Sequence, residues 1–78
     1  MAHTYKIKPL QWKQIHNYRW AAIDSISRLV IIFDVRSQSY DLWCEAVVVD
    51  NFRSLSKAQA FAEEYHIAKI REYLEALE

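Results

Sequence analysis

The sequence predicts an α+β domain, an antiparallel β-meander of three to five strands packed on one long C-terminal α-helix. Short runs rich in β-branched and aromatic residues occupy residues 10–49 and are separated by polar residues, which is typical of strands and turns. From residue 55 onward, apolar residues recur with the 3.6-residue period of a helix. The 78 residues are enough for one small domain, and we expect it to span residues 1–78.

The first two strands are predicted at residues 10–15 and 19–24, joined by a turn at His16-Asn17. Alternation places Leu10 and Trp12 on one face of the first strand. The chain contains no glycine, and Asn and Asp adopt positive φ more readily than other residues. We therefore expect this turn and a second one at Asp50-Asn51 to supply any positive φ.

The next two strands lie around a polar turn at residues 36–39. Residues 29–33 are continuously apolar and predict a central strand that is covered on both faces. Residues 40–49 alternate, with one face formed by Tyr40, Leu42, Cys44 and Ala46 and the other by Asp41, Trp43, Glu45 and Val47. Residues 46–49 either complete this strand or form a separate one after a bulge near Glu45.

The helix is predicted over residues 55–77, with Ser54 or Ser56 as its N-cap. The apolar stripe expected to pack on the sheet consists of Ala58, Phe61, Ala62, Tyr65 and Ala68. A second apolar stripe, here called the helix stripe, consists of Ile67, Ile70, Leu74 and Leu77. A helix of this length is roughly 34 Å long, whereas a strand spans only about 17–20 Å. We therefore expect the helix to extend beyond the sheet.

The charges are unevenly distributed although the net charge is zero. Residues 1–40 contain six Lys or Arg and two Asp, a net charge of +4, while residues 41–78 contain four and eight, a net charge of −4. This asymmetry either forms a bipolar surface that steers a partner or is neutralised within the fold. No signal peptide and no apolar run of about 20 residues is present, so no membrane association is predicted. The single Cys44 fits a reducing cytoplasm.

Residues with potential chemistry do not form a recognisable catalytic set. Glu63 and His66 have the Glu-x-x-His spacing of di-iron bundles, but those sites need a second such motif. Cys44 alternates into the inward face, where we expect a buried thiol rather than a nucleophile. Without glycine, a phosphate-binding P-loop cannot form. We therefore expect no enzyme, no catalytic residue, no metal site and no cofactor.

The helical segment carries a resemblance. Residues 52–70, FRSLSKAQAFAEEYHIAKI, are similar to the C-terminal signature of small uncharacterised phage and prophage proteins, in which F-x-S-L-x-x-A-K-x-x-A leads into H/Y-x-x-x-I. Gln59 stands where that family has Lys. Trp20-Ala21 and the runs at 29–33 and 40–42 fall where the family has strands, so the resemblance spans about residues 12–73. It implies a mobile-element origin, a location in the bacterial host cytoplasm and a fold distantly like double-stranded-RNA-binding domains.

Protein binding is the predicted function. One helix covers one face of a sheet, so Trp43, with Val30 and Ile32, is expected on an uncovered face, and exposed apolar patches mark interfaces. The candidate partner-binding residues are Trp43, Ile67, Ile70, Leu74 and Leu77. We expect a two-fold homodimer and, from the phage resemblance, a host protein or complex as target, with inhibition of a host defence complex as the outcome. The alternative for the helix stripe is that residues 5–10 cover it.

Nucleic-acid binding is the alternative function. The basic half of the chain contributes Lys6, Lys8, Lys13, Arg19, Arg28 and Arg36. Aromatic residues are interleaved with these cations, namely Tyr5, Trp12, Tyr18, Trp20, Phe33 and Tyr40. Cations beside stacking rings hold single-stranded nucleic acid. However, the isoelectric point of about 6.8 lacks the basic excess usual for such domains.

Overall fold

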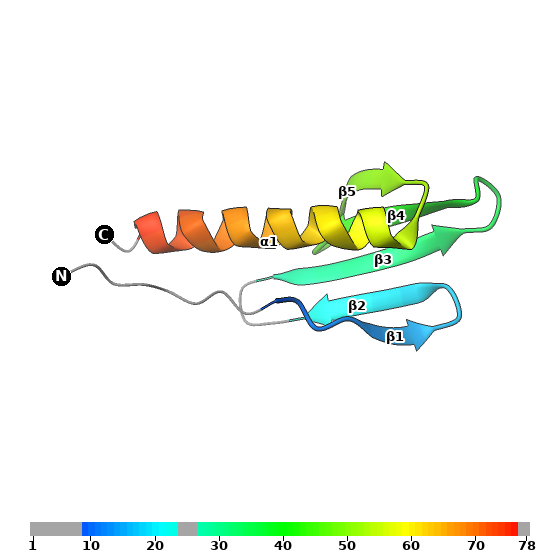
Figure 1. The fold of residues 1–78 in the computed structure, drawn as a ribbon, viewed down its shortest axis with the longest axis horizontal. Coiled ribbons are helices and arrows are strands. Elements are labelled where there is room, and N and C mark those ends of the chain that lie inside the picture. Colours follow the sequence, from blue (N-terminus) through cyan, green and yellow to red (C-terminus); the bar gives the residue numbers. More distant parts are fainter. Residues whose placement is uncertain (1–8, 24–26, 77–78) are drawn as a thin grey trace.

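A five-stranded antiparallel sheet with one long helix on one of its faces forms the protein, in a computed structural model that describes residues 9–23 and 27–76. The elements are β1 (Lys13–His16), β2 (Arg19–Ile23), β3 (Arg28–Asp34), β4 (Ser39–Cys44), β5 (Val47–Phe52) and α1 (Leu55–Ala76). The strands lie side by side in chain order, with β3 in the middle. Figure 1 shows α1 running along the strands. The predicted α+β meander with a C-terminal helix is confirmed.

The first strand begins later than expected, because the residues before it contact the helix instead of pairing with β2. Leu10 is only 9% exposed, and its backbone N–H donates to Glu63 Oε1 over 2.6 Å. This contact draws the chain toward α1 and leaves only Lys13–His16 to pair with β2. The prediction of a strand over residues 10–15 is therefore wrong at its start, although Leu10 and Trp12 lie on the same side, as predicted, and both pack at the core.

Positive φ angles occur at residues other than those predicted. Gln38 (φ 52°) ends the turn between β3 and β4, and Glu45 (φ 59°) begins the turn between β4 and β5. Asp50 and Asn51 instead lie within β5. The expectation that Asn or Asp must supply positive φ was wrong, because the tight β3–β4 and β4–β5 connections impose the left-handed conformation on whichever residue occupies them.

The chain after β4 forms a separate strand, the second of the two predicted alternatives. Glu45 and Ala46 make the turn, so Ala46 is exposed rather than inward-facing. The register between β4 and β5 shifts between Leu42 and Trp43, because Leu42 pairs with Asp50 and Trp43 with Val48. The extra residue, Val49, therefore lies in β5, whereas the bulge was predicted near Glu45, at the end of β4.

The helix begins after Ser54, whose Oγ accepts the backbone N–H of Lys57 over 3.1 Å. Ser54 is thus the N-cap. The buried side of α1 follows Ala58, Ala62 and His66, a spacing of four residues. Ala68, predicted to face the sheet, is exposed. The four-residue spacing from Ala58 to His66 turns the buried side of the helix away from Ala68. Leu77 lies outside the described residues.

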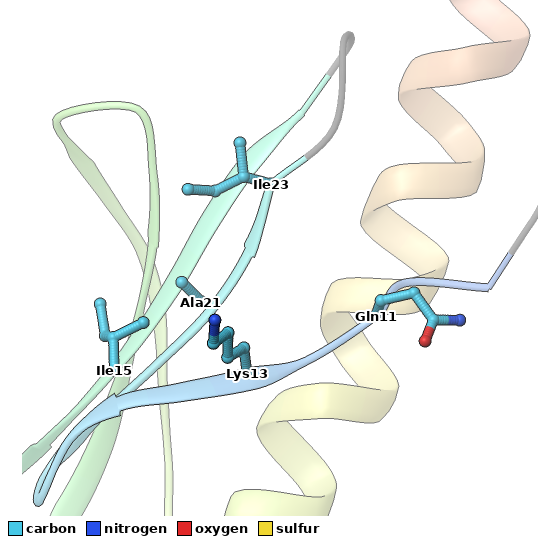
Figure 2. Close-up of a pocket in the computed structure, with 5 residues that line it drawn as sticks. All are labelled: Gln11, Lys13, Ile15, Ala21 and Ile23. Atoms are coloured by element: carbon cyan, nitrogen blue, oxygen red, sulfur yellow. The ribbon is translucent and has the colours of Figure 1, made fainter.

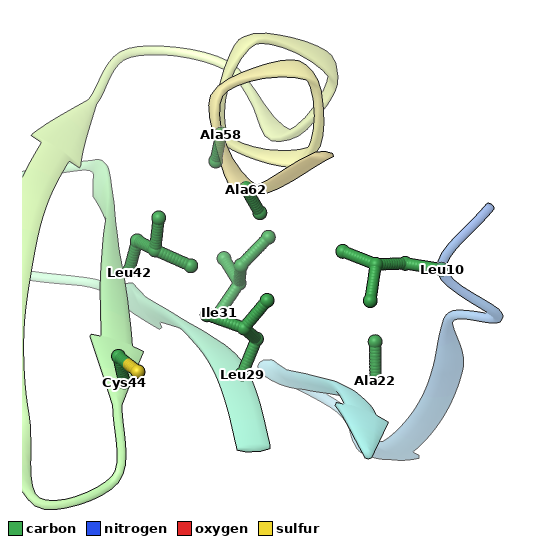
Figure 3. Close-up of a cluster of buried hydrophobic side chains, with 8 residues drawn as sticks. All are labelled: Leu10, Ala22, Leu29, Ile31, Leu42, Cys44, Ala58 and Ala62. Atoms are coloured by element: carbon green, nitrogen blue, oxygen red, sulfur yellow. The ribbon is translucent and has the colours of Figure 1, made fainter. Parts of the chain in front are cut away.

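The core lies between α1 and one face of the sheet, as Figure 3 shows. Its buried side chains are Leu10, Ala22, Leu29, Ile31, Leu42, Cys44, Ala58 and Ala62. The two small alanines of α1 let the helix approach the larger side chains of β3 and β4. Each fully buried Leu or Ile contributes about 1.5–3 kcal/mol.

The C-terminal part of α1 projects past the strands, as the helix length predicted (Figure 1). Two contacts mark where it leaves the sheet. His66 lies against Ser27 at the start of β3, and Lys69 lies against Cys44 at the end of β4. Residues 70–76 continue for about 10 Å beyond this level.

Candidate functional site: the helix-free face of the sheet

The face of the sheet opposite α1, here called the helix-free face, carries a continuous row of apolar side chains. Val30 pairs with Ala21 on β2 and with Trp43 on β4, and Trp43 pairs with Val48 on β5. Directly paired residues of antiparallel strands share a face, and Val30 alternates with the buried Leu29 and Ile31. We call Ala21, Val30, Trp43 and Val48 the apolar row. Its geometry confirms the expected side for Trp43.

This row is only partly buried. Val48 is 46% exposed, whereas Ala21 is 6% exposed because its short side chain lies beneath its neighbours. Two isoleucines at the β1–β2 side of the face are more open still, Ile15 at 55% and Ile23 at 63%. Exposed apolar surface that is contiguous in this way marks a site of interaction with another molecule.

An open hollow of about 230 Å³ lies beside the apolar row (Figure 2). Its lining residues are Gln11, Lys13, Ile15, Ala21 and Ile23, and Ala21 forms its floor. The other four are exposed, so a small ligand placed here would remain largely in water. Small-molecule sites bury most of their ligand. The hollow therefore fits one protruding side chain of a larger partner better than a free small molecule.

A second row, here called the mixed row, crosses the same face toward the β3–β4 turn. It consists of Arg19, Ile32, Asp41 and Asn51, which are successive register partners. The Asn51 side-chain amide donates to Asp41 Oδ1 over 2.5 Å and to Ser39 Oγ over 2.9 Å. The helix-free face thus has an apolar half and a hydrogen-bonded half.

Three of the six predicted basic residues gather on the helix-free face. Lys13 pairs with Ala21, Arg19 with Ile32 and Arg28 with Ile23. Within the described ranges, no hydrogen bond or ion pair involves any of these three side chains. Arg36 lies in the β3–β4 turn, while Lys6 and Lys8 lie outside the described residues. The face therefore carries three cations that form no ion pair with another described residue.

The aromatic residues of the basic half lie on the other side of the sheet. Phe33 packs against Tyr18 and Tyr40 with ring-centre distances of 5.7 and 4.9 Å, and Trp20 lies 5.9 Å from Tyr40. Trp12, Trp20 and Tyr40 pack against the core beneath α1. The sheet therefore separates these rings from the cations, although the sequence interleaves them. Tyr5 lies outside the described residues.

The helix stripe is partly covered. Ile67, Ile70 and Leu74 are all partly buried, although residues 70–76 extend past the strands. The chain before β1 reaches this side of α1, because the Leu10 amide binds Glu63 one turn before Ile67. Residues 5–8, which the alternative prediction places over the stripe, lie outside the described residues. Both predictions for the stripe therefore stay open.

His66 is a structural residue that sequence reasoning missed. It is 1% exposed and its Nδ1 lies 2.9 Å from Ser27 Oγ. Glu63, three residues earlier, binds the Leu10 amide instead, so the Glu-x-x-His pair is not brought to one site. The spacing from Ala58 and Ala62 to His66 was the available signal for burial.

Cys44 is buried, as the alternation predicted, and belongs to a polar cluster at the end of β4. Lys69 Nζ donates to Cys44 Sγ over 3.4 Å and lies 5.8 Å from the centre of the Tyr65 ring. The hydrogen bond with Cys44 raises the pKa of Lys69, and a hydrogen bond with Cys44 also raises the pKa of Tyr65. Both groups therefore keep their protons, and the cluster joins helix to sheet.

Comparison of the chain with protein-family models, with curated proteins and with solved structures finds no match. The resemblance to small phage proteins therefore stays a prediction. In residues 9–23 and 27–76, no helix combines the length and the apolar character needed to cross a lipid bilayer. Within the same ranges, no three His, Cys, Asp or Glu residues come together as metal ligands would.

Proposed function

We propose that the protein is a non-catalytic binding protein that acts by contacting other protein chains. The observation that carries this proposal is the apolar row, with Trp43 between Val30 and Val48 on a face that α1 does not cover. Tryptophan is among the residues most enriched at the energetic centres of protein interfaces. A sheet face with this composition is suited to bind protein.

Two partners belong to the proposal, a second copy of the chain and a host protein. The helix-free face and the helix stripe offer separate apolar surfaces, so both contacts are sterically compatible. The resemblance of residues 52–70 to phage proteins supports a bacterial host protein as target, and inhibition of a host defence complex as the consequence of binding.

A binding role is also supported by the positions of the chemically reactive side chains. Cys44 and His66 are buried beneath α1 and contact Lys69 and Ser27. Neither lies on the helix-free face, where a substrate would meet it. An activity that is lost on changing Cys44, His66 or His16, with folding and partner binding intact, would contradict the proposal.

Capture from a bacterial lysate, followed by cross-linking and mass spectrometry, tests the host-protein contact. The wild type is compared with Ile70→Glu plus Leu74→Glu. The matched control, Ala68→Glu plus Ala76→Glu, adds the same two carboxylates at exposed positions of α1. We expect the wild type and the control to capture the same host protein and the stripe variant to lose it, because a carboxylate is costly in an apolar contact.

Equal capture of that protein by all three baits would contradict a host contact through the helix stripe. A thermal melt of each bait separates loss of binding from loss of folding. If the stripe variant alone unfolds, the stripe belongs to the core, and the alternative in which residues 5–10 cover it gains support.

Nucleic acid remains the second candidate partner, because Lys13, Arg19 and Arg28 share one face and form no ion pair with another described residue. The aromatic cluster of Tyr18, Trp20, Phe33 and Tyr40 lies on the opposite face, so among the described aromatic residues only Trp43 could stack with bases beside these cations. Mobility shifts with single- and double-stranded DNA and RNA at about 50 and 200 mM salt test whether the protein binds nucleic acid. Binding through lysine and arginine should weaken steeply with salt, and the absence of any shift at micromolar protein in the lower salt would exclude this candidate.

A further inference from the structure

We infer that the helix-free face is covered by the same face of a second copy of this chain, related by a two-fold axis parallel to β3. The inference rests on the proposed function, in which this face binds protein, and it names the partner. Two sheets would then pack face to face, with the helices on the outside of the assembly. Such sheets pack about 10 Å apart with interdigitating side chains.

The position of β3 in the sheet determines which strands would meet. Because β3 is the middle strand of five, a two-fold axis above it and parallel to it places β3 over β3 of the second copy. The same rotation places β2 over β4 and β1 over β5. The rotation leaves the position of each residue along the strand direction unchanged. Each row of one copy therefore lies over the same row of the other. The twist of the sheets turns the copies by about 30° but keeps the central rows in contact.

The apolar row is complementary to itself in shape under this rotation. Ala21 on β2 faces Trp43 on β4 of the second copy, so the smallest side chain of the row lies opposite the largest. The hollow at Ala21, lined also by Lys13, Ile15 and Ile23, lies opposite the exposed edge of that Trp43, whose Nε1 is buried in its own chain. Val30 meets Val30 on the axis. The contact occurs twice, once on each side of the axis.

The mixed row is complementary to itself in charge. Arg19 on β2 and Asp41 on β4 are both register partners of Ile32, so the rotation places Arg19 over Asp41 of the second copy. Arg19 makes no ion pair within the described residues, and the only hydrogen bond of Asp41 to a described side chain is the one from Asn51. Two symmetric ion pairs flanking an apolar centre would fix the register of the two sheets.

Because Arg28 lies on β3 and shares the helix-free face with Val30, the axis also places Arg28 over Arg28 of the second copy, which is a like-charge contact. Each lies beside Glu45 of its own chain, whose backbone N–H donates to the Arg28 carbonyl over 3.1 Å. The Glu45 carboxylate does not offset this contact, because its charge acts on Lys69 on the α1 side of the sheet. The apolar row and the mixed row must therefore contribute more to association than the two Arg28 side chains cost.

This internal matching favours a second copy over an unrelated protein. A surface made for an unrelated partner requires no relation between Ala21 and Trp43, or between Arg19 and Asp41, within one chain. A two-fold interface requires both, since the same patch must serve on each side. The face is roughly 19 Å wide, from four strand spacings of about 4.8 Å. Such a footprint fits an interface at the lower end of the specific range, so we expect micromolar rather than nanomolar association.

Sedimentation of the full chain between about 5 and 500 µM tests the inference. We expect the wild type to dimerise in this range and Arg19→Asp or Asp41→Arg to weaken the dimer at least tenfold, because each places like charges opposite one another. Combining Arg19→Asp with Asp41→Arg should restore the affinity to within about threefold of the wild type. Arg36→Asp, in the β3–β4 turn, is the matched control and should leave the dimer unchanged.

Three outcomes would overturn the inference. A wild type that is monomeric at 500 µM excludes the dimer but leaves the host-protein proposal, whose lysate test is separate. A dimer that tolerates both single charge reversals uses another surface. A combined variant that is folded yet fails to recover excludes the Arg19–Asp41 pairing. Should Asp41→Arg unfold through loss of the Asn51 contact, Arg19→Glu against Arg36→Glu provides the same comparison.

Discussion

The two faces of the sheet both carry apolar side chains at their centre, but only one of them is covered by α1. On one face, Leu29, Ile31 and Leu42 are completely buried beneath α1. On the other, Val30 and Trp43 alternate with them along the same strands and remain partly exposed. Strands that are apolar on both faces are typical of sheets covered on both sides. Within the described residues, β3 is covered on one face only, and this difference is the reason why we propose that a second copy of the chain covers the other face.

Each face also pairs small residues with large ones. Beneath α1, Ala58 and Ala62 allow the helix to approach the leucine and isoleucine side chains of β3 and β4. On the helix-free face, the small Ala21 lies in the hollow that we propose to lie opposite Trp43 of a second copy. The packing of small against large side chains is thus observed within one chain beneath α1, and the proposed dimer would repeat it between two chains on the helix-free face.

The largest expected effect comes from truncating the two adjacent isoleucines of β3. Ile31→Ala should lower the free energy of unfolding by about 4 kcal/mol, since it removes a fully buried side chain and leaves a cavity. Ile32→Ala, one residue along and on the opposite face, should cost the dilute monomer only about 1 kcal/mol. Urea unfolding at low micromolar concentration measures both. Because the two variants share residue type and strand, β-propensity cancels in the comparison.

Repeating the Ile32→Ala measurement at high protein concentration tests whether the helix-free face becomes buried when the protein associates. If the helix-free face is buried in a dimer, the cost of this variant should grow with concentration, whereas the cost of Ile31→Ala should depend on it much less. If both variants lower the free energy of unfolding of the dilute monomer equally, Ile32 is as buried as Ile31, which would contradict an uncovered second face.

A smaller effect is expected from the buried histidine. His66→Ala should destabilise the protein by about 2 kcal/mol, because it leaves a gap beneath α1 and removes the contact with Ser27. His66→Asn retains a polar group near the position of Nδ1 and should recover part of this loss. His16→Ala, at an exposed position of β1, should remain within about 0.5 kcal/mol of the wild type. Thermal and urea unfolding of the three variants would check this, and a neutral His66→Ala would contradict the assigned role.

Local patterns in the sequence predicted the central strand, the faces of β4 and the helix. The continuous β-branched run of β3 and the strict alternation around Trp43 determine which side chains share a face, whatever the rest of the chain does. The N-cap was narrowed to Ser54 or Ser56, and the choice required the structure. The side of the sheet on which Trp43 lies was therefore predictable from residues within a few positions of it.

Features that depend on distant residues were not predictable in this way. The late start of β1 reflects the contact between Leu10 and Glu63, which are 53 positions apart. The burial of His66 reflects Ser27, 39 positions away. The hollow at Ala21 requires the register of β1 against β2. Positive φ at Gln38 reflects the turn geometry rather than the ordinary preference of the residue.

An isotope-filtered NOE experiment tests the central claim most directly. A sample that mixes ¹³C-labelled and unlabelled protein at several hundred micromolar reports only contacts between copies. The account predicts cross-peaks from the Ala21 methyl group of one copy to the Trp43 indole of the other, since β2 of each lies over β4 of its partner. A dimer whose intermolecular NOEs arise from α1, or from any surface other than the helix-free face, would contradict it.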